Sequence, residues 1–366
     1  MFECMFDVAS KHRATDNRQP ERQHDSCQSR IVTLTTVIIG SCIPHVPDHG
    51  SLRSRSAAML SSLTLREISR MLPADQAWGL WTSRQIVARI MDTCGPSLAG
   101  TRVTPVDTRG ADGSRVVGEW VSGAGTGQSH QAAIYFVHGS GYALCSPRTH
   151  RRLAAWLSRL TGLPVFSIDY RLAPRHRFPT AADDVRRGWH WLTAHHGIAP
   201  ERIVIAGDSA GGHLSLDLLL QPDIDHPAAL VLMSPLVDLT FTLARSAERT
   251  RRDPAIRARD AARLIELYCA ETDLAHPRLT LDVAGGRTLP PTLIQAGGAE
   301  MLSADAVALA EDLRAAGGRC DLQIWPDQVH VFQALPRLSP EAAPAMREIT
   351  AFVTDALRPN RIGQVG

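Results

Sequence analysis

The sequence lacks any paired arrangement of cysteines. Its seven cysteines are odd in number and widely scattered, and no two of them have Cys-x-x-Cys spacing. This pattern argues against a disulfide framework and against a structural zinc site, and it fits a reducing compartment. We therefore expect a cytoplasmic protein that holds no metal.

The sequence also lacks an apolar run long enough to cross a bilayer. Its one candidate, Ile31–Ile43, has about a dozen residues where roughly 20 are required. About thirty polar residues of mixed charge precede this run, whereas a secretory signal begins with a short basic segment. A disordered or wrongly assigned leader is the favoured interpretation, and a cleaved signal or membrane anchor is the alternative.

A large excess of charge of either sign is absent as well. The formal net charge is +2, which gives no reason to expect nucleic acid or an anionic membrane surface as a partner. The apolar fraction of 44% and the charged fraction of 21% are typical of a soluble globular protein. The length of 366 residues would allow two domains, although α/β hydrolytic domains often exceed the usual size as one unit.

The first hundred residues divide into two parts. Residues 1–50 mix basic, acidic and amide side chains without a sustained period, so we expect a disordered leader. Residues 51–100 contain two stretches with helical spacing of apolar residues, and Gly95-Pro96 ends the second. Trp78 and Trp81 have helical spacing in this part, which favours a place in the core.

Strand-like and helix-like segments alternate from Val103 onward. Val103–Thr108 and Arg115–Val121 flank a segment whose composition is typical of a hairpin turn. The later alternation predicts an α/β fold, with a mostly parallel sheet and helices on both faces. The predicted later strands are Gln131–Val137, Pro164–Tyr170, Arg202–Ala206, Ala228–Met233, Pro291–Gln295 and Cys320–Trp325, and the predicted helices are Ala154–Leu160, Ala181–His195, Gly211–Leu220 and Ala304–Ala316.

About fifty residues interrupt this alternation between Ser234-Pro235 and Pro290-Pro291. They are rich in Arg, Asp and Ala, and Arg257–Ala270 has a helical pattern. A long insertion at the carboxyl edge of a parallel sheet is usually a lid or a binding element. We therefore expect one α/β core over residues 101–357, with an insertion at about 238–285 and a tail at 358–366.

The hexapeptide Gly207–Gly212 is the most informative motif. Its sequence Gly-Asp-Ser-Ala-Gly-Gly follows the predicted strand Arg202–Ala206 and precedes the helix-forming segment His213–Leu219. A strand that ends on Gly-x-Ser-x-Gly and turns directly into a helix displays the serine hydroxyl at the edge of the sheet, above the positive end of the helix. Ser209 is therefore the candidate nucleophile.

A serine hydroxyl needs a base within hydrogen-bond reach, and the base needs a carboxylate to hold it. On a fold of this type the three residues follow in the order serine, acid, histidine. His330 lies just past the last predicted strand, where a general base is expected. His213 is a poorer candidate because it lies one helical turn from Ser209 and points along its own helix. His330 is therefore the candidate base.

Two acids are candidates for orienting His330. Glu300 follows the predicted strand Pro291–Gln295 and is the first choice, and Asp305 is its rival. An acid near the start of a helix also interacts favourably with the helix dipole and with free amides, without any catalytic role. The residues themselves leave the assignment open.

A second segment precedes the turn at Gly207–Gly212, which we call the elbow, and its backbone could bind an oxyanion. His138–Tyr142, with the sequence His-Gly-Ser-Gly-Tyr, follows the predicted strand Gln131–Val137. Small side chains let its backbone approach a substrate carbonyl, where preorganised N–H donors stabilise developing negative charge. The N–H of Ala210, the residue after the candidate nucleophile, would be a further donor.

In this order the motifs resemble those of the bacterial hormone-sensitive-lipase-like branch of the α/β-hydrolase carboxylesterases. His138–Gly141 is similar to that family's His-Gly-Gly-Gly loop, and Tyr170–Pro174 matches its Tyr-Arg-Leu-Ala-Pro block. Gly207–Gly212 matches its Gly-Asp-Ser-Ala-Gly-Gly elbow. The Glu300 region and Val329–Phe332 resemble the segments that carry its acid and its base.

The resemblance extends over residues 51–357 and implies an α/β-hydrolase fold whose cap is formed by the first two helices and the insertion. It implies Ser209 as nucleophile, His330 as base, Glu300 as acid, and Ser140, Gly141 and Ala210 as oxyanion donors. Two residues depart from the family pattern. Ser140 replaces a glycine, and Glu300 stands where aspartate is commonest. We expect Arg171 to form a buried structural ion pair with Asp183 or Asp184.

The function implied by the resemblance is that of a serine carboxylesterase. Such an enzyme hydrolyses short- to medium-chain acyl esters through an acyl-enzyme and needs no cofactor. A lipase, an amidase or a lactonase would use the same triad, and a non-catalytic ligand-binding protein is the alternative from another class. The expected partner is a small acyl ester, and the sequence leaves open whether the chain forms a homodimer.

Overall fold

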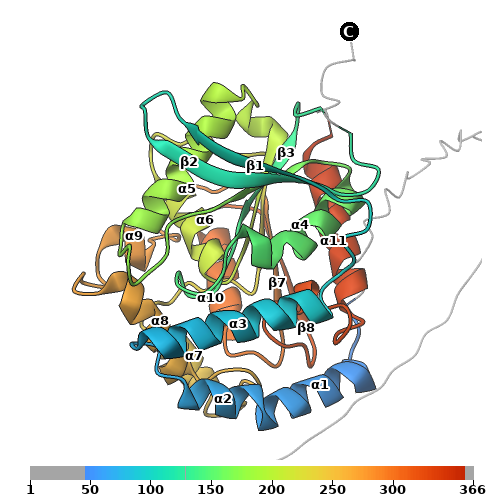
Figure 1. Cartoon of the computed structure of the whole chain (residues 1–366), viewed down its shortest axis with the longest axis vertical. Coiled ribbons are helices and arrows are strands. Elements are labelled where there is room, and N and C mark those ends of the chain that lie inside the picture. Colours follow the sequence, from blue (N-terminus) through green and yellow to red (C-terminus); the bar gives the residue numbers. More distant parts are fainter. Residues whose placement is uncertain (1–45, 128, 359–366) are drawn as a thin grey trace, which may run out of the picture. The chain divides into compact units, whose positions relative to one another are not determined.

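An eight-stranded sheet forms the centre of the computed structural model, which describes residues 46–127 and 129–358 (Figure 1). The strand order is β1-β2-β4-β3-β5-β6-β7-β8, and neighbouring strands are parallel except where β2 pairs with β1 and with β4. The strands are β1 Arg102–Arg109, β2 Arg115–Ser122, β3 Ala133–Val137, β4 Val165–Ile168, β5 Ile203–Asp208, β6 Ala229–Met233, β7 Thr292–Gly297 and β8 Cys320–Trp325.

Helices cover both faces of the sheet, as the alternation in the sequence predicts (Figure 1). The helix pair α4 and α11 packs together, and so does the pair α5 and α6. The α-helices are α1 Leu52–Leu63, α2 Leu65–Met71, α3 Ala77–Cys94, α4 Pro147–Thr161, α5 Thr180–His190, α6 Ala210–Leu220, α7 Thr242–Ala247, α8 Ala258–Cys269, α9 Pro277–Thr280, α10 Ser303–Ala315 and α11 Ala342–Ala356. Short η elements lie at Trp191–His195, Pro200–Arg202 and Phe332–Ala334.

The largest error in the predicted boundaries is at the start of α4. This helix begins at Pro147, well before the expected Ala154. Proline suits the first helical position, and a capping box formed by Ser146 and Thr149 closes the N-terminus. The first turns are rich in polar residues, so the apolar period that guided the prediction begins late.

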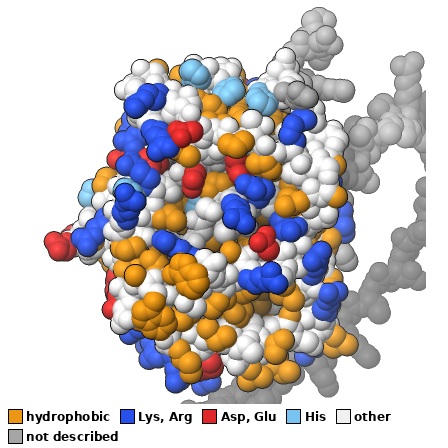
Figure 2. All heavy atoms as spheres, viewed as in Figure 1, with side chains coloured by type: hydrophobic (Ala, Val, Ile, Leu, Met, Phe, Trp, Pro, Cys, Tyr) orange, Lys and Arg blue, Asp and Glu red, His pale blue; other side chains and the backbone are white. Residues whose placement is uncertain are grey.

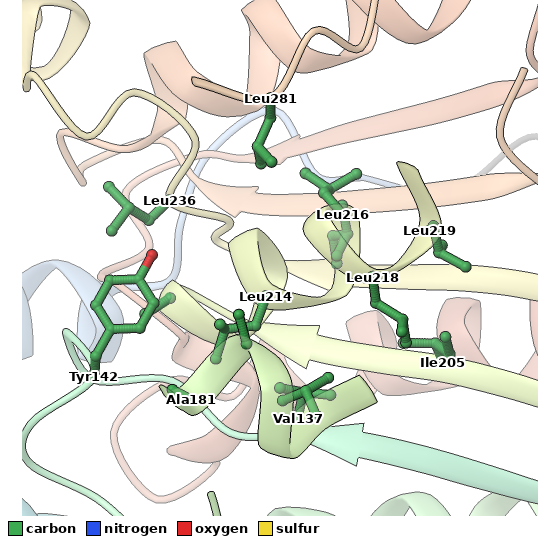
Figure 3. Packing of buried hydrophobic residues seen from close by; sticks show 14 of the residues in the cluster. Val137, Tyr142, Ala181, Ile205, Leu214, Leu216, Leu218, Leu219, Leu236 and Leu281 are labelled. Atoms are coloured by element: carbon green, nitrogen blue, oxygen red, sulfur yellow. The ribbon is translucent and has the colours of Figure 1, made fainter. Parts of the chain in front are cut away.

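Strand residues alternate between two hydrophobic clusters, one on each face of the sheet. Tyr135 and Ile205 belong to the cluster that also holds residues of α5, α6 and α10. Phe136 and Val204 belong to the cluster that holds residues of α4 and α11. Successive side chains of a strand point to opposite faces, so burial of both faces requires the continuous apolar runs seen in the sequence. Figure 3 shows part of the first cluster, with Leu218 of α6 beside Ile205 of β5.

Helix α6 crosses the sheet very closely because its first turn is built from glycine. A Cβ on Gly211 would collide with the carbonyl oxygens of Val137 and His138. A Cβ on Gly207 would lie 2.7 Å from the carbonyl oxygen of Gly211. The two glycines therefore bring the start of α6 against the end of β3.

The segments expected to form a cap contain helices. Residues 51–100 contain α1, α2 and α3, and the insertion at about 238–285 contains α7, α8 and α9. Arg257 of the insertion and Glu67 of α2 form an ion pair at 2.7 Å, so the two segments touch. Most of the expected leader, residues 1–45, and the tail from residue 359 lie outside the described residues.

The expectation that Trp78 and Trp81 lie in the core is wrong. Their exposed fractions are 55% and 62%. Figure 2 shows hydrophobic side chains gathered at the lower left of this face, over the region where Figure 1 places α3. Helical spacing shows that two residues share a face, but it does not show which face meets the core. No helix in the described ranges has the length and apolar character needed to span a bilayer.

We expect Gly211→Ala to destabilise the protein because the added methyl group must displace the backbone of β3. The free energy of unfolding, measured by urea denaturation, should fall by about 3 kcal/mol, the upper part of the usual range for overpacking. Gly127→Ala is the matched control, because a Cβ there meets nothing within 4 Å. Equal stabilities of the two variants would contradict the close crossing.

Candidate active site

Ser209 lies at the sharp turn between β5 and α6. Its backbone has φ 50° and ψ −122°, a region that side-chain-bearing residues rarely adopt. Its N–H donates to the carbonyl oxygen of Met233 at 3.0 Å, and its own carbonyl oxygen accepts from the N–H of Leu236 at 3.1 Å. The surrounding hydrogen bonds therefore hold the strained residue in place at the N-terminus of α6.

The side chain of Glu300 is buried and has a hydrogen-bond donor for each oxygen. Its Oε1 accepts from the hydroxyl of Ser234 at 2.7 Å and from the N–H of Gly297 at 2.6 Å. Its Oε2 accepts a hydrogen bond from Nδ1 of His330. Burial of a carboxylate is costly unless it is paired and hydrogen-bonded, and these donors meet that requirement.

His330 is held by its contact with Glu300 and by its neighbour in the chain. The N–H of Val331 donates to the Ser234 hydroxyl at 3.0 Å, so one serine binds both the acid and the histidine loop. Burial lowers the pKa of His330, but the nearby carboxylate of Glu300, with smaller contributions from Asp253 and Asp208, outweighs it and raises the pKa above its ordinary value of 6.5.

Ser209 and His330 line the same cavity. No hydrogen bond joins their side chains in the described part of the chain. Such contacts are often long in a site without substrate and shorten when substrate binds.

Asp305, the rival acid, has a different environment. Its Oδ1 accepts from the backbone N–H groups of Val237 and Asp238 at 2.9 and 2.8 Å. Burial raises its pKa to about 7. No hydrogen bond or ion pair in the described ranges joins it to His330. Asp305 thus fixes the chain after β6, whereas Glu300 contacts the histidine.

The loop after β3 presents backbone donors towards the same cavity. Ser140 and Gly141 both line it and both have positive φ, 88° and 60°. Neither N–H donates to a backbone acceptor outside regular elements. Ala210 is the first residue of α6, so its N–H has no partner within that helix. The amides of Ser140 and Gly141 are thus without a backbone partner at the cavity, whereas Ala210 is buried and does not line it.

Asp208 and His150 form a buried pair beside this loop that the sequence analysis missed. Asp208 Oδ1 accepts from the N–H of Gly139 at 3.1 Å, and His150 Nε2 lies 3.2 Å from Oδ2. Burial raises the pKa of Asp208, but the charge and hydrogen bond of His150 lower it overall. The available signal was the acidic residue directly before Ser209. His150 gave none, because it lies inside an unpredicted helical turn.

His138, in the loop after β3, has a structural role. His138 is fully buried and stacks on Tyr170, with ring centroids 4.2 Å apart. The Tyr170 hydroxyl donates to the His138 carbonyl oxygen at 2.7 Å. Burial lowers the pKa of His138 to about 3, so this side chain is neutral near pH 7. It holds the loop and carries no charge to a ligand.

The expected ion pair of Arg171 is present, but it is not buried as a whole: Asp184 is nearly buried and the Arg171 side chain is half exposed. Its Nε and Nη2 each lie 2.8 Å from an oxygen of Asp184, and its backbone N–H donates to the same carboxylate. Asp183 instead accepts from Arg278 at 2.9 Å. The Arg171–Asp184 pair ties the turn after β4 to α5, and the Arg278–Asp183 pair ties α9 to α5. None of these residues lines the cavity.

The cavity has a volume of about 350 Å³ and a mainly apolar lining. One wall comes from α1, α2 and α3, and another comes from α8 and the chain before it. Its apolar side chains include Ile68, Leu72, Ile86, Val87, Leu264 and Ile265. A volume of this size is sufficient for a small organic ligand.

Comparison with known proteins agrees with this geometry. Residues 134–334 match a family described as alpha/beta hydrolase fold. The carboxylesterase/phospholipase LipF of Mycobacterium tuberculosis is 32% identical, over 86% of this chain and 85% of that protein. The chain belongs to the α/β-hydrolase family.

Further relatives place it within the hormone-sensitive-lipase-like esterases of this family. An esterase of the bacterial hormone-sensitive lipase family has a similar structure, with a TM-score of 0.73 and 27% identity, over 84% of this chain and 99% of that one. An acetyl-hydrolase of Streptomyces hygroscopicus is 35% identical, over 65% of this chain and 79% of that protein. This α/β-hydrolase is therefore an ester hydrolase, as the sequence motifs predict.

We expect Glu300→Gln in this hydrolase to lower the turnover of p-nitrophenyl acetate by about 10³–10⁴-fold, since loss of the acid removes the partner of imidazolium and its orientation. Asp305→Asn is the matched control. It keeps an oxygen for the N–H groups of Val237 and Asp238, and its turnover should stay within about threefold of wild type. A larger loss of turnover in Asp305→Asn than in Glu300→Gln would assign the role of the acid to Asp305.

Proposed function

We propose that the protein is a serine carboxylesterase that acts on short- to medium-chain acyl esters. The hydrogen bond between Glu300 and His330, at a cavity that also exposes Ser209, is the observation that carries the proposal. In this proposal Ser209 is the nucleophile, His330 the base and Glu300 the acid. The oxyanion donors are the backbone amides of Ser140, Gly141 and Ala210.

The reaction follows from these positions. Ser209 Oγ attacks the ester carbonyl carbon while Nε2 of His330 accepts its proton, and the carbonyl electrons move onto an oxyanion that the three amides stabilise. The intermediate then expels the alcohol, which takes the proton from His330. Water then attacks the acyl-enzyme by the same route. The carboxylic acid product is released, and Ser209 recovers its proton from His330.

The cavity supports an acyl group of limited length. Its lining is mainly apolar, so a hydrocarbon chain is favoured over a charged or sugar-like group. Its volume of about 350 Å³ lies near the lower end of the range for small-molecule sites. We therefore propose that acetyl to octanoyl esters are preferred over long-chain lipids.

A cytoplasmic location is part of the proposal. The four cysteines in the described residues, Cys94, Cys145, Cys269 and Cys320, are all free thiols. Free thiols are usual in a reducing compartment. The partner that we propose is a small acyl ester.

The direct test is hydrolysis of p-nitrophenyl esters from acetate to palmitate by wild type and Ser209→Ala. We expect wild type to prefer short and medium chains, and the variant to lose about 10⁴-fold or more in turnover, because no other nucleophile replaces the hydroxyl. A fluorophosphonate probe should label wild type and leave Ser209→Ala unlabelled.

Other results would indicate other functions. Preference for palmitate would favour a lipase, and turnover of an anilide or a lactone in place of esters would favour an amidase or a lactonase. A folded wild type that neither hydrolyses esters nor takes the probe would contradict the catalytic proposal and favour a ligand-binding role.

The pH dependence follows from the pKa of His330. This side chain must be neutral to accept the Ser209 proton, so kcat/KM falls as the pH drops through its pKa. Burial lowers this pKa and the carboxylates near it raise it, with a net rise above 6.5. We therefore expect half-maximal kcat/KM above pH 6.5, measured with p-nitrophenyl butyrate. A half-maximal value below pH 6.5 would contradict the charge arrangement.

A further inference from the structure

Asp253 is a buried acid in the insertion between β6 and β7 that the proposed reaction does not use. Its exposed fraction is 1%, and it lines the same cavity as Ser209 and His330. It lies far from Glu300 in the chain. A buried carboxylate is costly and requires an explanation from its partners.

The partners of the Asp253 carboxylate come from two places. Its Oδ1 accepts from the N–H groups of Ala255 and Ile256 at 2.7 and 3.2 Å, which closes a local turn. Its Oδ2 accepts from the N–H of Met301 at 2.9 Å. Met301 directly follows Glu300, so one oxygen organises the insertion and the other holds the loop that carries the acid.

Helix α2 holds the same segment from the other side. Nη1 of Arg66 donates to the carbonyl oxygen of Asp253 and, at 3.3 Å, to that of Ile256. Its Nη2 lies 3.2 Å from Glu248, whose other oxygen accepts from the N–H of Ala258 at 3.0 Å. A continuous series of polar contacts therefore runs from α2 through the insertion to the residue after Glu300.

The charge of Asp253 also reaches His330. Three carboxylates from different segments raise the pKa of His330: Glu300 after β7, which contacts it, and Asp253 in the insertion and Asp208 at the end of β5, which line the same cavity. On the neighbouring loops, Arg251 is paired with Asp327 at 3.6 Å. Asp253 and His330 line the same cavity, and no hydrogen bond or ion pair in the described ranges joins them, so Asp253 acts on the imidazolium only through its charge. Burial raises the pKa of Asp253 itself, while the hydrogen bonds from Met301, Ala255 and Ile256 favour its charged form.

We propose that Asp253 is a positioning residue, which fixes the Glu300 loop beneath the cap through the Met301 N–H and supplies a second negative charge beside His330. The proposal rests on the esterase site described above. If this is so, the alignment of Glu300 and His330 depends on the position of the insertion between β6 and β7. Closure of the insertion over a substrate would then be coupled to the alignment of the acid and the base.

The test compares Asp253→Asn with wild type in the pH profile of p-nitrophenyl butyrate hydrolysis. Loss of the charge destabilises the imidazolium, so the acidic limb of kcat/KM should move to lower pH by about 0.5–1 unit. Misplacement of the acid loop should lower kcat by about 10–100-fold with little change in KM. A residue that serves only to shape the cap would change KM and leave the acidic limb in place, and this result would overturn the proposal.

Asp260→Asn is the matched control. Asp260 is also a buried acid of the insertion, with 8% exposure, and it lines the same cavity, but it makes no contact with Met301. Its removal should leave the acidic limb at the wild-type pH. An equal shift in both variants would show that any cavity carboxylate has this effect, and would overturn a specific role for Asp253.

Two further measurements test the proposal if Asp253→Asn folds poorly. Asp253→Ser keeps an oxygen for the turn at Ala255 but cannot reach Met301, and it should show the same shift. Hydrogen exchange of wild type should show a protected Met301 amide, and rapid exchange there would contradict the contact. Failure of the proposed function itself is distinct, because it would appear as ester hydrolysis that survives in Ser209→Ala, or as a folded wild type that neither hydrolyses esters nor takes the fluorophosphonate probe.

Discussion

The arrangement of the active site depends on one buried carboxylate. Glu300 receives hydrogen bonds from Ser234 after β6, from Gly297 at the end of β7 and from His330 after β8. A buried charge that lost one of these donors would pay a desolvation penalty of about 1–3 kcal/mol or more. The requirement to satisfy this carboxylate therefore holds three loops together, and the proposed base takes its orientation from that constraint.

The other buried acids of the site serve loops in the same way. Asp208 binds the Gly139 N–H of the loop after β3, Asp305 binds the chain after β6, and Asp253 binds the residue after Glu300. Donors to these four carboxylates come from the chain after β3, β6, β7 and β8. The core beneath them is apolar on both faces of the sheet.

Much of the fold was predictable because its signals are local. Buried strands require continuous apolar runs, and the elbow requires glycines at fixed spacing, so β5, β6 and α6 lie close to their predicted ranges. The predictions for the start of α4 and for the burial of Trp78 and Trp81 were wrong. In both cases the residues show a helix, but partner surfaces decide its extent and its buried face. His150, whose role comes from Asp208 far along the chain, was not predictable for the same reason.

The sequence by itself determined the alternation of strands and helices, the family motifs and the order of the candidate nucleophile, acid and base, because each depends on residues adjacent in the chain or on their order. It could not choose between Glu300 and Asp305, which lie five positions apart in similar surroundings. Only the tertiary structure separated them. Parallel strands bring Ser234, Gly297 and His330 to one carboxylate, and the Val237 and Asp238 amides to the other.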